Sequence, residues 1–182
     1  MCGRFSIAGF EGIEERFQLE IEFPDLKPNY NVAPSQNVPV IPNNGSNQLA
    51  LFRWGLIPYW AKDPAIGHKM INARAETVDE KPSFKTCLQR KRCLIVADGF
   101  YEWKKEGTTK RPHRITLTNK ELFGFAFGTR GSHQPGISSI HALLSQQRLM
   151  NLWNLYTIAC LSFSQGKLSR CGWTRVLLIA IF

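Results

Sequence analysis

The second residue of the chain, Cys2, carries the most distinctive chemistry in the sequence. A residue as small as cysteine allows Met1 to be removed, by methionine aminopeptidase or by self-cleavage. Cys2 then presents a thiol together with an α-amine whose pKa is about 8, so that a useful fraction of the amine is nucleophilic at neutral pH. An aldehyde is the natural target, because the amine can form a Schiff base and the thiol can then close a thiazolidine ring. A buried thiol without chemistry is the alternative for this position alone.

Three further polar residues have types and spacing that suit acid-base catalysis and the binding of one ligand. Glu102 stands among aromatic residues after the apolar run Cys93–Ala97, a partly buried setting that favours general acid-base catalysis. Asn72 and Arg74 are two positions apart, so in an extended segment both side chains lie on one face and can serve one ligand. A guanidinium suits a phosphate. The alternatives are a solvated glutamate and, for Arg74, an ion pair with Glu76.

Several aromatic side chains could stack on unpaired bases, as aromatic platforms commonly do in proteins that bind single strands. Trp60 and Trp103 are the stronger candidates and Trp54 the weaker one, while a place in the hydrophobic core is the alternative for all three. Pro34 could shape a turn beside such a platform.

These residues fall in five ordered blocks that together resemble the SRAP family, the SOS response-associated peptidases that process abasic sites. The blocks are Met1-Cys2-Gly3-Arg4-Phe5, Tyr30-Asn31-Val32-Ala33-Pro34, Arg53-Trp54-Gly55-Leu56-Ile57-Pro58, Ile71-Asn72-Ala73-Arg74-Ala75-Glu76-Thr77 and Ala97-Asp98-Gly99-Phe100-Tyr101-Glu102-Trp103. Any one block alone is weak evidence for the family, but five blocks in the same order over residues 1–103 make the resemblance specific.

The resemblance implies a function and a role for each site residue. Cys2 would capture abasic sites in single-stranded DNA as a covalent crosslink, with abasic-site lyase activity and self-removal of Met1 as an (auto)peptidase. Glu102 would shuttle protons and Asn72 would orient the sugar. The DNA-binding residues would be Arg4, Pro34, Trp60, Arg74 and Trp103.

The elements that must position these residues are mostly short strands. Strand signals cover Leu49–Trp54, Cys93–Ala97, the alternating run His113–Thr118 and, more weakly, Val38–Ile41, which Pro39 would confine to a sheet edge. Weaker helical signals cover Gly12–Leu19 and a stretch from Ser83, as cap, to Arg92. We therefore expect an α+β fold, a single SRAP-like domain built on antiparallel β-sheet with peripheral helices.

Composition narrows the class of protein. With 182 residues and 43% hydrophobic content, the chain can bury one ordinary core. It has no signal-peptide pattern and no apolar run long enough to span a bilayer, so we expect a cytoplasmic, nucleoid-associated monomer without membrane contact. Five cysteines without a CxxC pair predict reduced thiols, no metal site and no cofactor.

The C-terminal part departs from this pattern. All 14 acidic residues lie between Glu11 and Glu121, so residues 122–182 have none, and about half of the net charge of +9 comes from that acid-free part. The family continues with a Phe-Ala-Gly-Leu-Trp block and an Ile-His-x-Arg-Met-Pro block that carries an active-site histidine. This chain departs after Gly124-Phe125-Ala126, and neither His133 nor His141 lies in a family motif.

A codon argument suggests the cause. With synonymous codons chosen freely, DNA that encodes residues 140–165 also reads, in another frame, a family-like block that contains Ile-His-His-Arg-Met-Pro. The codon of its first histidine straddles the codons of Tyr156 and Thr157. We therefore expect residues 1–126 to form the N-terminal two thirds of the domain and residues 127–182 to be an out-of-frame tail. The chain as written would then be impaired.

Two other functions are compatible with parts of the sequence. N-terminal-nucleophile glutamine amidotransferases also begin Met-Cys-Gly, but they leave Asn72-Ala73-Arg74 and Phe100-Tyr101-Glu102-Trp103 without a role. A noncatalytic single-stranded DNA-binding protein would use the same basic and aromatic residues. A glutaminase assay separates the first alternative, and covalent trapping separates the second.

Overall fold

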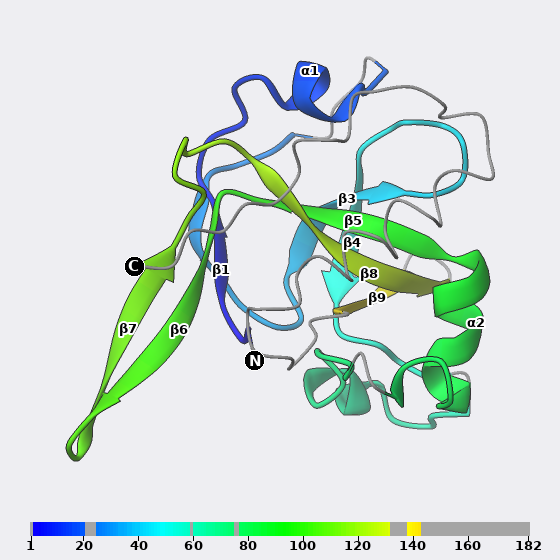
Figure 1. Ribbon diagram of the computed structural model, residues 1–182. Helices are drawn as coiled ribbons and strands as arrows, with labels where there is room; N and C mark the ends of the chain where they lie inside the picture. Colours follow the sequence, from blue (N-terminus) through cyan, green and yellow to red (C-terminus); the bar gives the residue numbers. More distant parts are fainter. Residues whose placement is uncertain (1, 21–24, 59, 75–76, 132–137, 143–182) are drawn as a thin grey trace.

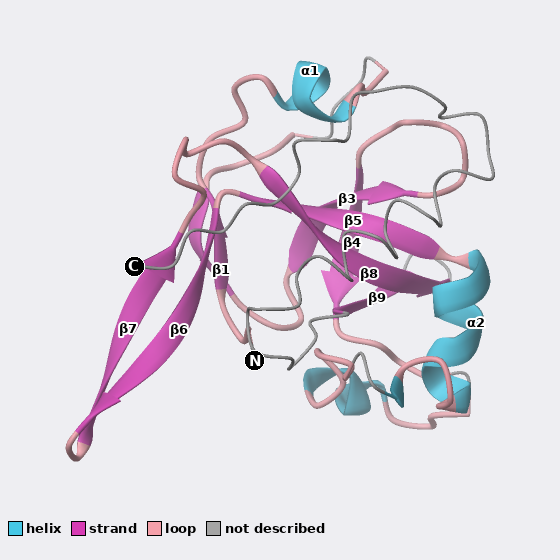
Figure 2. Ribbon diagram, viewed as in Figure 1, coloured by secondary structure: helices cyan, strands magenta, loops and turns pink. Residues whose placement is uncertain are grey.

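The computed structural model describes residues 2–20, 25–58, 60–74, 77–131 and 138–142. Its strands form two sheets, a four-stranded sheet and a closed five-stranded barrel, and the helices lie around their edges (Figures 1 and 2). The chain therefore has the expected α+β fold, built almost entirely on antiparallel pairs.

The four-stranded sheet has the order β2-β1-β6-β7, with every neighbouring pair antiparallel. Its strands are β1 (Phe5–Ile7), β2 (Asn29–Val32), β6 (Gly99–Glu106) and β7 (Thr109–Ile115). The β6–β7 hairpin is longer than its neighbours and projects away from the rest of the domain (Figure 1). Its tip is therefore open to solvent on both faces.

The barrel closes in the order β3-β4-β9-β8-β5, and β4 and β9 form its one parallel pair. Its strands are β3 (Asn37–Pro42), β4 (Ala50–Trp54), β5 (Arg92–Ala97), β8 (Phe123–Gly131) and β9 (Ser138–Ala142). The expected break after residue 126 falls inside β8. That domain boundary stays a prediction, because residues 132–137 and 143–182 lie outside the described part of the chain.

The core lies between the barrel and the four-stranded sheet. The Phe5 ring of β1 is 5.2 Å from Trp54 and 5.8 Å from Phe125, and Phe100 of β6 is 5.9 Å from Phe125. Phe5 and Trp54 are each only 1% exposed. Trp54 is therefore a core residue, and the idea that it stacks on DNA is wrong.

The helices are short and lie at the edges of the sheets. They are α1 (Ile13–Phe17), the 3₁₀ helix η1 (Pro64–His68) and α2 (Pro82–Arg90). Ser83 is not the cap of α2, as the sequence suggested. The cap position belongs to Lys81, and Pro82 takes the first helical position, where a missing N–H leaves no hydrogen bond unmade.

The expected strands at Leu49–Trp54 and Cys93–Ala97 are confirmed as β4 and β5. The expected strand His113–Thr118 is shifted, because β7 begins at Thr109 and ends at Ile115. Its first half carries charged side chains at successive positions, which hide the alternation. The strand is nonetheless held by seven consecutive pairs with β6.

The prediction of an edge position for Pro39 is wrong, since β3 has a partner on each side. Pro39 pairs with Leu51 of β4, whereas the pairing of β3 with β5 begins one residue later, at Val40 and Ile95. Pro39 therefore has no paired residue in β5. A proline is tolerated in this central strand because the pairing of β3 with β4 and the pairing of β3 with β5 begin at different residues.

Candidate active site and DNA-binding face

Cys2 lies just before β1 and is 3% exposed. Its Sγ is 3.2 Å from the carbonyl oxygen of Arg4, and its own carbonyl accepts a hydrogen bond of 2.9 Å from Nδ2 of Asn72. Arg4 is held in turn, because its carbonyl accepts a 2.9 Å bond from the Tyr101 N–H of β6. The backbone around the thiol is thus fixed from two sides.

The electrostatic setting of Cys2 keeps its thiol protonated. Burial, reinforced by the negative charge of Glu102, raises the pKa of the Cys2 thiol from 9.0 to about 12. The structure thus places the predicted nucleophile and the predicted proton shuttle within electrostatic reach of each other. A neutral thiol beside a carboxylate is able to give up its proton when it attacks an electrophile.

The two polar atoms of the Asn72 side-chain amide differ in their hydrogen bonding. Its Nδ2 donates to Cys2, while its Oδ1 is buried and makes no hydrogen bond within the described residues. Such an atom is costly to leave unsatisfied, so it marks a place where a donor from a substrate fits. Trp54 holds the neighbouring residue, because its Nε1 donates to the carbonyl of Ile71 at 3.2 Å.

The register of β6 sorts its side chains onto two faces. Phe100 faces the core, so Glu102 lies on the same face of the strand, whereas Tyr101 and Trp103 lie on the outer face. Arg4 precedes the core residue Phe5 and also belongs to the outer face. Its Nη1 donates to Oδ1 of Asn31 at 2.9 Å, and Trp103 is 44% exposed.

The remaining predicted DNA-binding residues lie on the surface of other segments. Pro34 is in the β2–β3 turn, Trp60 follows β4 and is 57% exposed, and Arg74 is exposed two residues after Asn72. Within the described residues, no hydrogen bond joins any of the three to Cys2. The proposed pairing of Arg74 with Glu76 cannot be described, because Glu76 lies outside the described residues.

Sequence reasoning missed two polar contacts that position the site. Ser35 Oγ and His68 Nδ1 are 2.9 Å apart and join the β2–β3 turn to the end of η1. Asp98 accepts bonds from Ser6 Oγ at 2.6 Å, from the Ala8 N–H at 2.7 Å and from Arg114 at 2.9 Å. An acidic residue directly after the apolar strand β5 was the available signal for Asp98.

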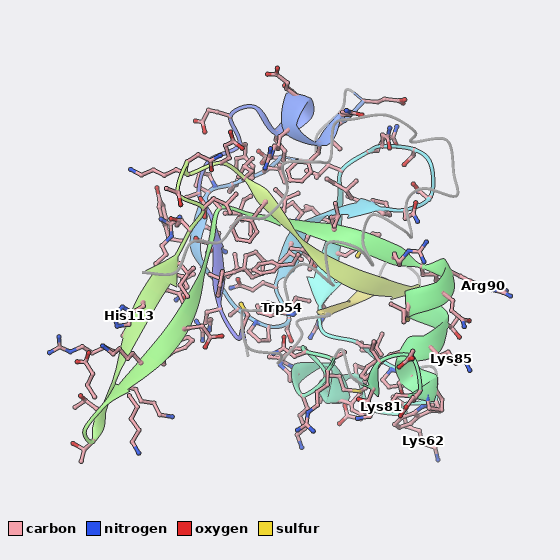
Figure 3. All side chains as sticks on the ribbon, in the orientation of Figure 1. Trp54, Lys62, Lys81, Lys85, Arg90 and His113 are labelled. Atoms are coloured by element: carbon pink, nitrogen blue, oxygen red, sulfur yellow. The ribbon has the colours of Figure 1, made fainter. Side chains whose placement is uncertain are left out.

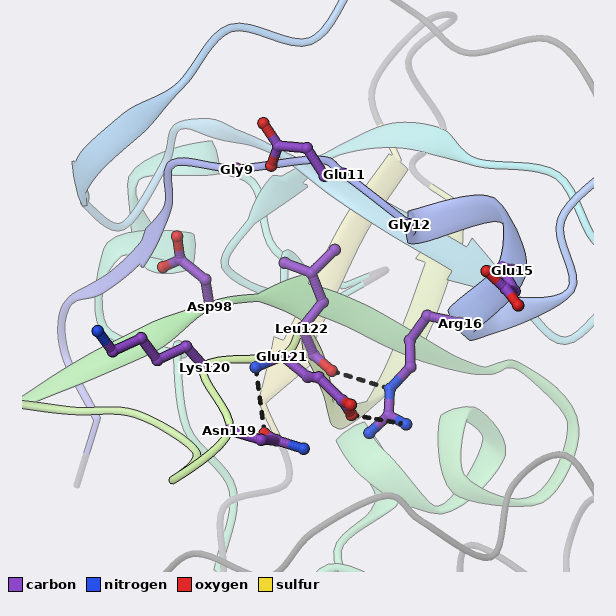
Figure 4. A pocket seen from close by; sticks show the side chains of 10 residues that line it. All are labelled: Gly9, Glu11, Gly12, Glu15, Arg16, Asp98, Asn119, Lys120, Glu121 and Leu122. Carbon is purple, nitrogen blue, oxygen red and sulfur yellow. Dashed lines mark hydrogen bonds and ion pairs between the residues drawn. The ribbon is translucent and has the colours of Figure 1, made fainter.

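A cleft of about 580 Å³ lies between α1 and the segment that joins β7 to β8, and Asp98 is part of its lining (Figure 4). Its charged lining is mostly acidic, and Arg16 crosses it to reach Glu121 at 3.1 Å. None of the predicted site residues lines this cleft. Within the described residues, no group of three or more His, Cys, Asp or Glu side chains could hold a metal ion, and no helix could cross a membrane.

The fold and these contacts define a small α+β domain with a buried N-terminal cysteine. A family model described as SOS response associated peptidase (SRAP) matches residues 1–137, so the chain belongs to the SRAP family. This assignment, rather than any single motif, separates the chain from the glutamine amidotransferases that share its Met-Cys-Gly start.

Curated relatives carry names that refer to abasic sites. The chain is 55% identical over 131 residues to the abasic site processing protein YoaM of Bacillus subtilis, which covers 69% of this chain and 58% of the relative. It is 37% identical over 102 residues to the abasic site processing protein HMCES of Xenopus tropicalis, covering 49% and 30% of the two chains. The chain thus spans about three fifths of the length of the bacterial relative.

Solved structures share the fold. A protein from Bacteroides thetaiotaomicron is 26% identical with a TM-score of 0.65, covering 79% of this chain and 67% of that one. A phage-related protein from Bordetella bronchiseptica is 23% identical with a TM-score of 0.62, covering 79% and 69%.

Proposed function

We propose that this chain captures abasic sites in single-stranded DNA through Cys2, after Met1 has been removed. The observation that carries the proposal is the environment of Cys2, whose carbonyl is held by Asn72 and whose thiol lies within the field of Glu102. The names of the curated relatives support the same substrate. The protein would then work in the cytoplasm, on DNA of the nucleoid.

The chemistry follows from the two nucleophiles of an N-terminal cysteine. The ring-opened abasic sugar exposes an aldehyde, and the α-amine of Cys2 adds to it and loses one water to form a Schiff base. The thiol then adds to the same carbon and closes a thiazolidine, its proton passing to Glu102 and from there to the ring nitrogen. Because the pKa of the thiol is about 12, the amine reacts first and the thiol adds from its neutral form.

The other predicted residues hold the substrate in this scheme. The unsatisfied Oδ1 of Asn72 accepts a hydrogen bond from the sugar or from the α-amine. Arg74 binds the flanking phosphate. The exposed rings of Trp60 and Trp103, with Pro34 and Arg4, contact the strand on either side of the abasic site.

Covalent trapping tests the proposal. Single-stranded DNA containing one uracil is treated with uracil-DNA glycosylase and incubated with the protein, and we expect a protein-DNA band that survives denaturation. The band should vanish in Cys2→Ala and persist in Cys87→Ala, a matched change of a buried cysteine in α2. Retention of the band in Cys2→Ala would remove Cys2 from the mechanism, and no band in the wild type would leave only noncovalent binding.

We also propose that residues 127–182 are an out-of-frame tail that lacks the family histidine. The absence of acidic residues after Glu121 supports this, because a reading-frame shift replaces the composition of the family's own C-terminal part. Sequencing the gene across the codon of Ala126 tests the proposal. An alternate frame that does not encode the Ile-His-x-Arg-Met-Pro block would end it.

A further inference from the structure

The tip of the β6–β7 hairpin places like charges directly opposite each other on both of its faces. Lys104 pairs with Arg111 on the face of Glu102, and Lys105 pairs with Lys110 on the outer face. Like charges at opposed positions of an antiparallel pair destabilise it. Two such pairs in succession therefore weaken the hairpin unless something negative lies against them.

Among the described residues, a carboxylate neutralises one of the two pairs and not the other. Glu106 lies 3.6 Å from Lys104 and 3.2 Å from Arg111, so a carboxylate bridges the pair on the face of Glu102. Within the described residues, no ion pair involves Lys105 or Lys110, and both side chains are exposed. The outer face of the hairpin tip thus presents two uncompensated positive charges.

These two lysines continue a row that begins beside Cys2. Arg4 and Trp103 share the outer face with them, and Trp103 is 44% exposed. From Trp103 to Lys105 the strand rises about 7 Å, comparable with two stacked nucleotides at about 3.4 Å each. We call these four residues, Arg4, Trp103, Lys105 and Lys110, the outer track.

We propose that the outer track carries the unpaired DNA strand from Cys2 to the hairpin tip, where Lys105 and Lys110 hold its phosphates. This inference rests on the proposed function and names the surface that the strand follows. An exposed indole with flanking cations is the arrangement that binds single strands, since a base can stack on the ring only when it is unpaired. Arg4 can also bind a phosphate of the strand, because its hydrogen bond to Asn31 uses only one of the five guanidinium N–H donors.

The test measures noncovalent binding of the full chain to a fluorescent, undamaged oligothymidine at several salt concentrations. Each phosphate contact contributes about 0.7 to the slope of log affinity against log salt for a single strand. The Lys105→Ala/Lys110→Ala double variant should therefore lower that slope by about 1.4 and bind roughly tenfold more weakly in low salt. The control, Lys85→Ala/Arg90→Ala, removes the same charge from α2, which lies on the other side of the molecule (Figure 3).

A slope in the hairpin variant equal to that of the control would overturn the proposal. So would a lysine effect that appears only with a blunt duplex or with RNA of the same length. Thermal unfolding adds an independent check, because Lys105→Glu converts the like-charge pair into an attractive one. This variant should unfold at a higher temperature than the wild type while binding DNA more weakly; loss of stability together with binding would mean that the hairpin had merely been damaged.

The same assays separate this inference from the covalent function. Undamaged DNA offers no aldehyde, so the slope of log affinity against log salt reports on noncovalent binding to the outer track alone. If the slope changes as expected but the wild type forms no crosslink with abasic DNA, the track stands and the covalent function fails. If the crosslink forms but the slope does not change, the covalent function stands and the track fails.

Discussion

The side-chain amide of Asn72 donates a 2.9 Å hydrogen bond to the main-chain carbonyl of Cys2, across 70 positions of the sequence. The bond fixes the main chain of Cys2 against the segment that carries Asn72. Because the other amide atom of Asn72 is buried without a partner, the side chain can hold the cysteine and the substrate at once.

Replacing Asn72 by alanine should therefore slow crosslinking to an abasic oligonucleotide roughly tenfold. One hydrogen bond contributes about 1 kcal/mol, and a factor of ten corresponds to about 1.4 kcal/mol. The initial rate of band formation on denaturing gels measures the effect. Asn44→Ala, in an exposed turn, is the matched control and should react at the wild-type rate. An unchanged rate in Asn72→Ala would show that this bond does not matter to the reaction.

The Cys2 thiol should resist alkylation up to an unusually high pH. Because burial raises its pKa to about 12, the reactive thiolate is scarce at pH values where an exposed cysteine is already ionised. The negative charge of Glu102 also raises the pKa, so Glu102→Gln should lower it and move the onset of alkylation to lower pH. Mass spectrometry of the Cys2 peptide after iodoacetamide treatment gives the profile. Glu106→Gln, on the same strand, is the control and should leave the pH dependence of alkylation unchanged. An identical pH dependence in Glu102→Gln and the wild type would contradict the effect of the Glu102 charge on the pKa of the thiol.

Asp98 should make the folded state sensitive to acid. Its partial burial acts to raise its pKa, but hydrogen bonds from Ser6, Ala8 and Arg114 outweigh this and lower it below 3.8. A carboxyl group with a lowered folded-state pKa stabilises the fold above its unfolded pKa, and that contribution is lost as the pH falls through the folded value.

Asp98→Asn should accordingly destabilise the protein by about 2 kcal/mol at pH 7, since it removes charged hydrogen bonds, and by less below pH ~3. Urea unfolding at the two pH values measures the difference. Asp25→Asn is the control, because the Asp25 side chain is 86% exposed. An equal effect of Asp98→Asn at both pH values would contradict this assignment.

Gly55 is required by a close backbone approach. Its φ is +127°, and a Cβ there would lie 2.4 Å from the carbonyl oxygen of Gly67 in η1. Gly55→Ala should cost more than about 2 kcal/mol of unfolding free energy, because strain and a backbone clash combine. Gly107→Ala is the matched control, with φ +61° but nothing within 4 Å, and should cost about 1 kcal/mol. Equal midpoints of urea unfolding for the two variants would rule out the clash.

Release of a formed crosslink should be slower for this chain than for an intact relative. The family histidine has no counterpart in a motif of this sequence, and it would be lost with a shift of frame near Ala126. Crosslinks purified with each protein can be followed over time on denaturing gels. Release at the same rate from both proteins would show that the histidine is not needed or that the C-terminal part supplies its role.

Local sequence was enough to predict β4, β5 and the α+β class, because both strands are rich in apolar residues, interrupted in β4 only by Arg53. It was not enough for β7, where charged residues on successive positions conceal the strand, or for Pro39, whose tolerance depends on the stagger between β4 and β5. Trp54 belongs to the core because Phe5, from a strand of the other sheet, packs against its ring and leaves it 1% exposed.

By itself, the sequence determined which reactive residue types are present and where, with Cys2 at the second position and Glu102 among aromatic residues, and it determined the family through its ordered blocks. Only the tertiary structure decided that Asn72 reaches the carbonyl of Cys2 and that Glu102 acts on its thiol. The register of β6 and β7 likewise decided which lysines share a face with Trp103. The physical reason is that residue type sets reactivity locally, whereas contacts between residues 70 or more positions apart depend on how the sheets pair.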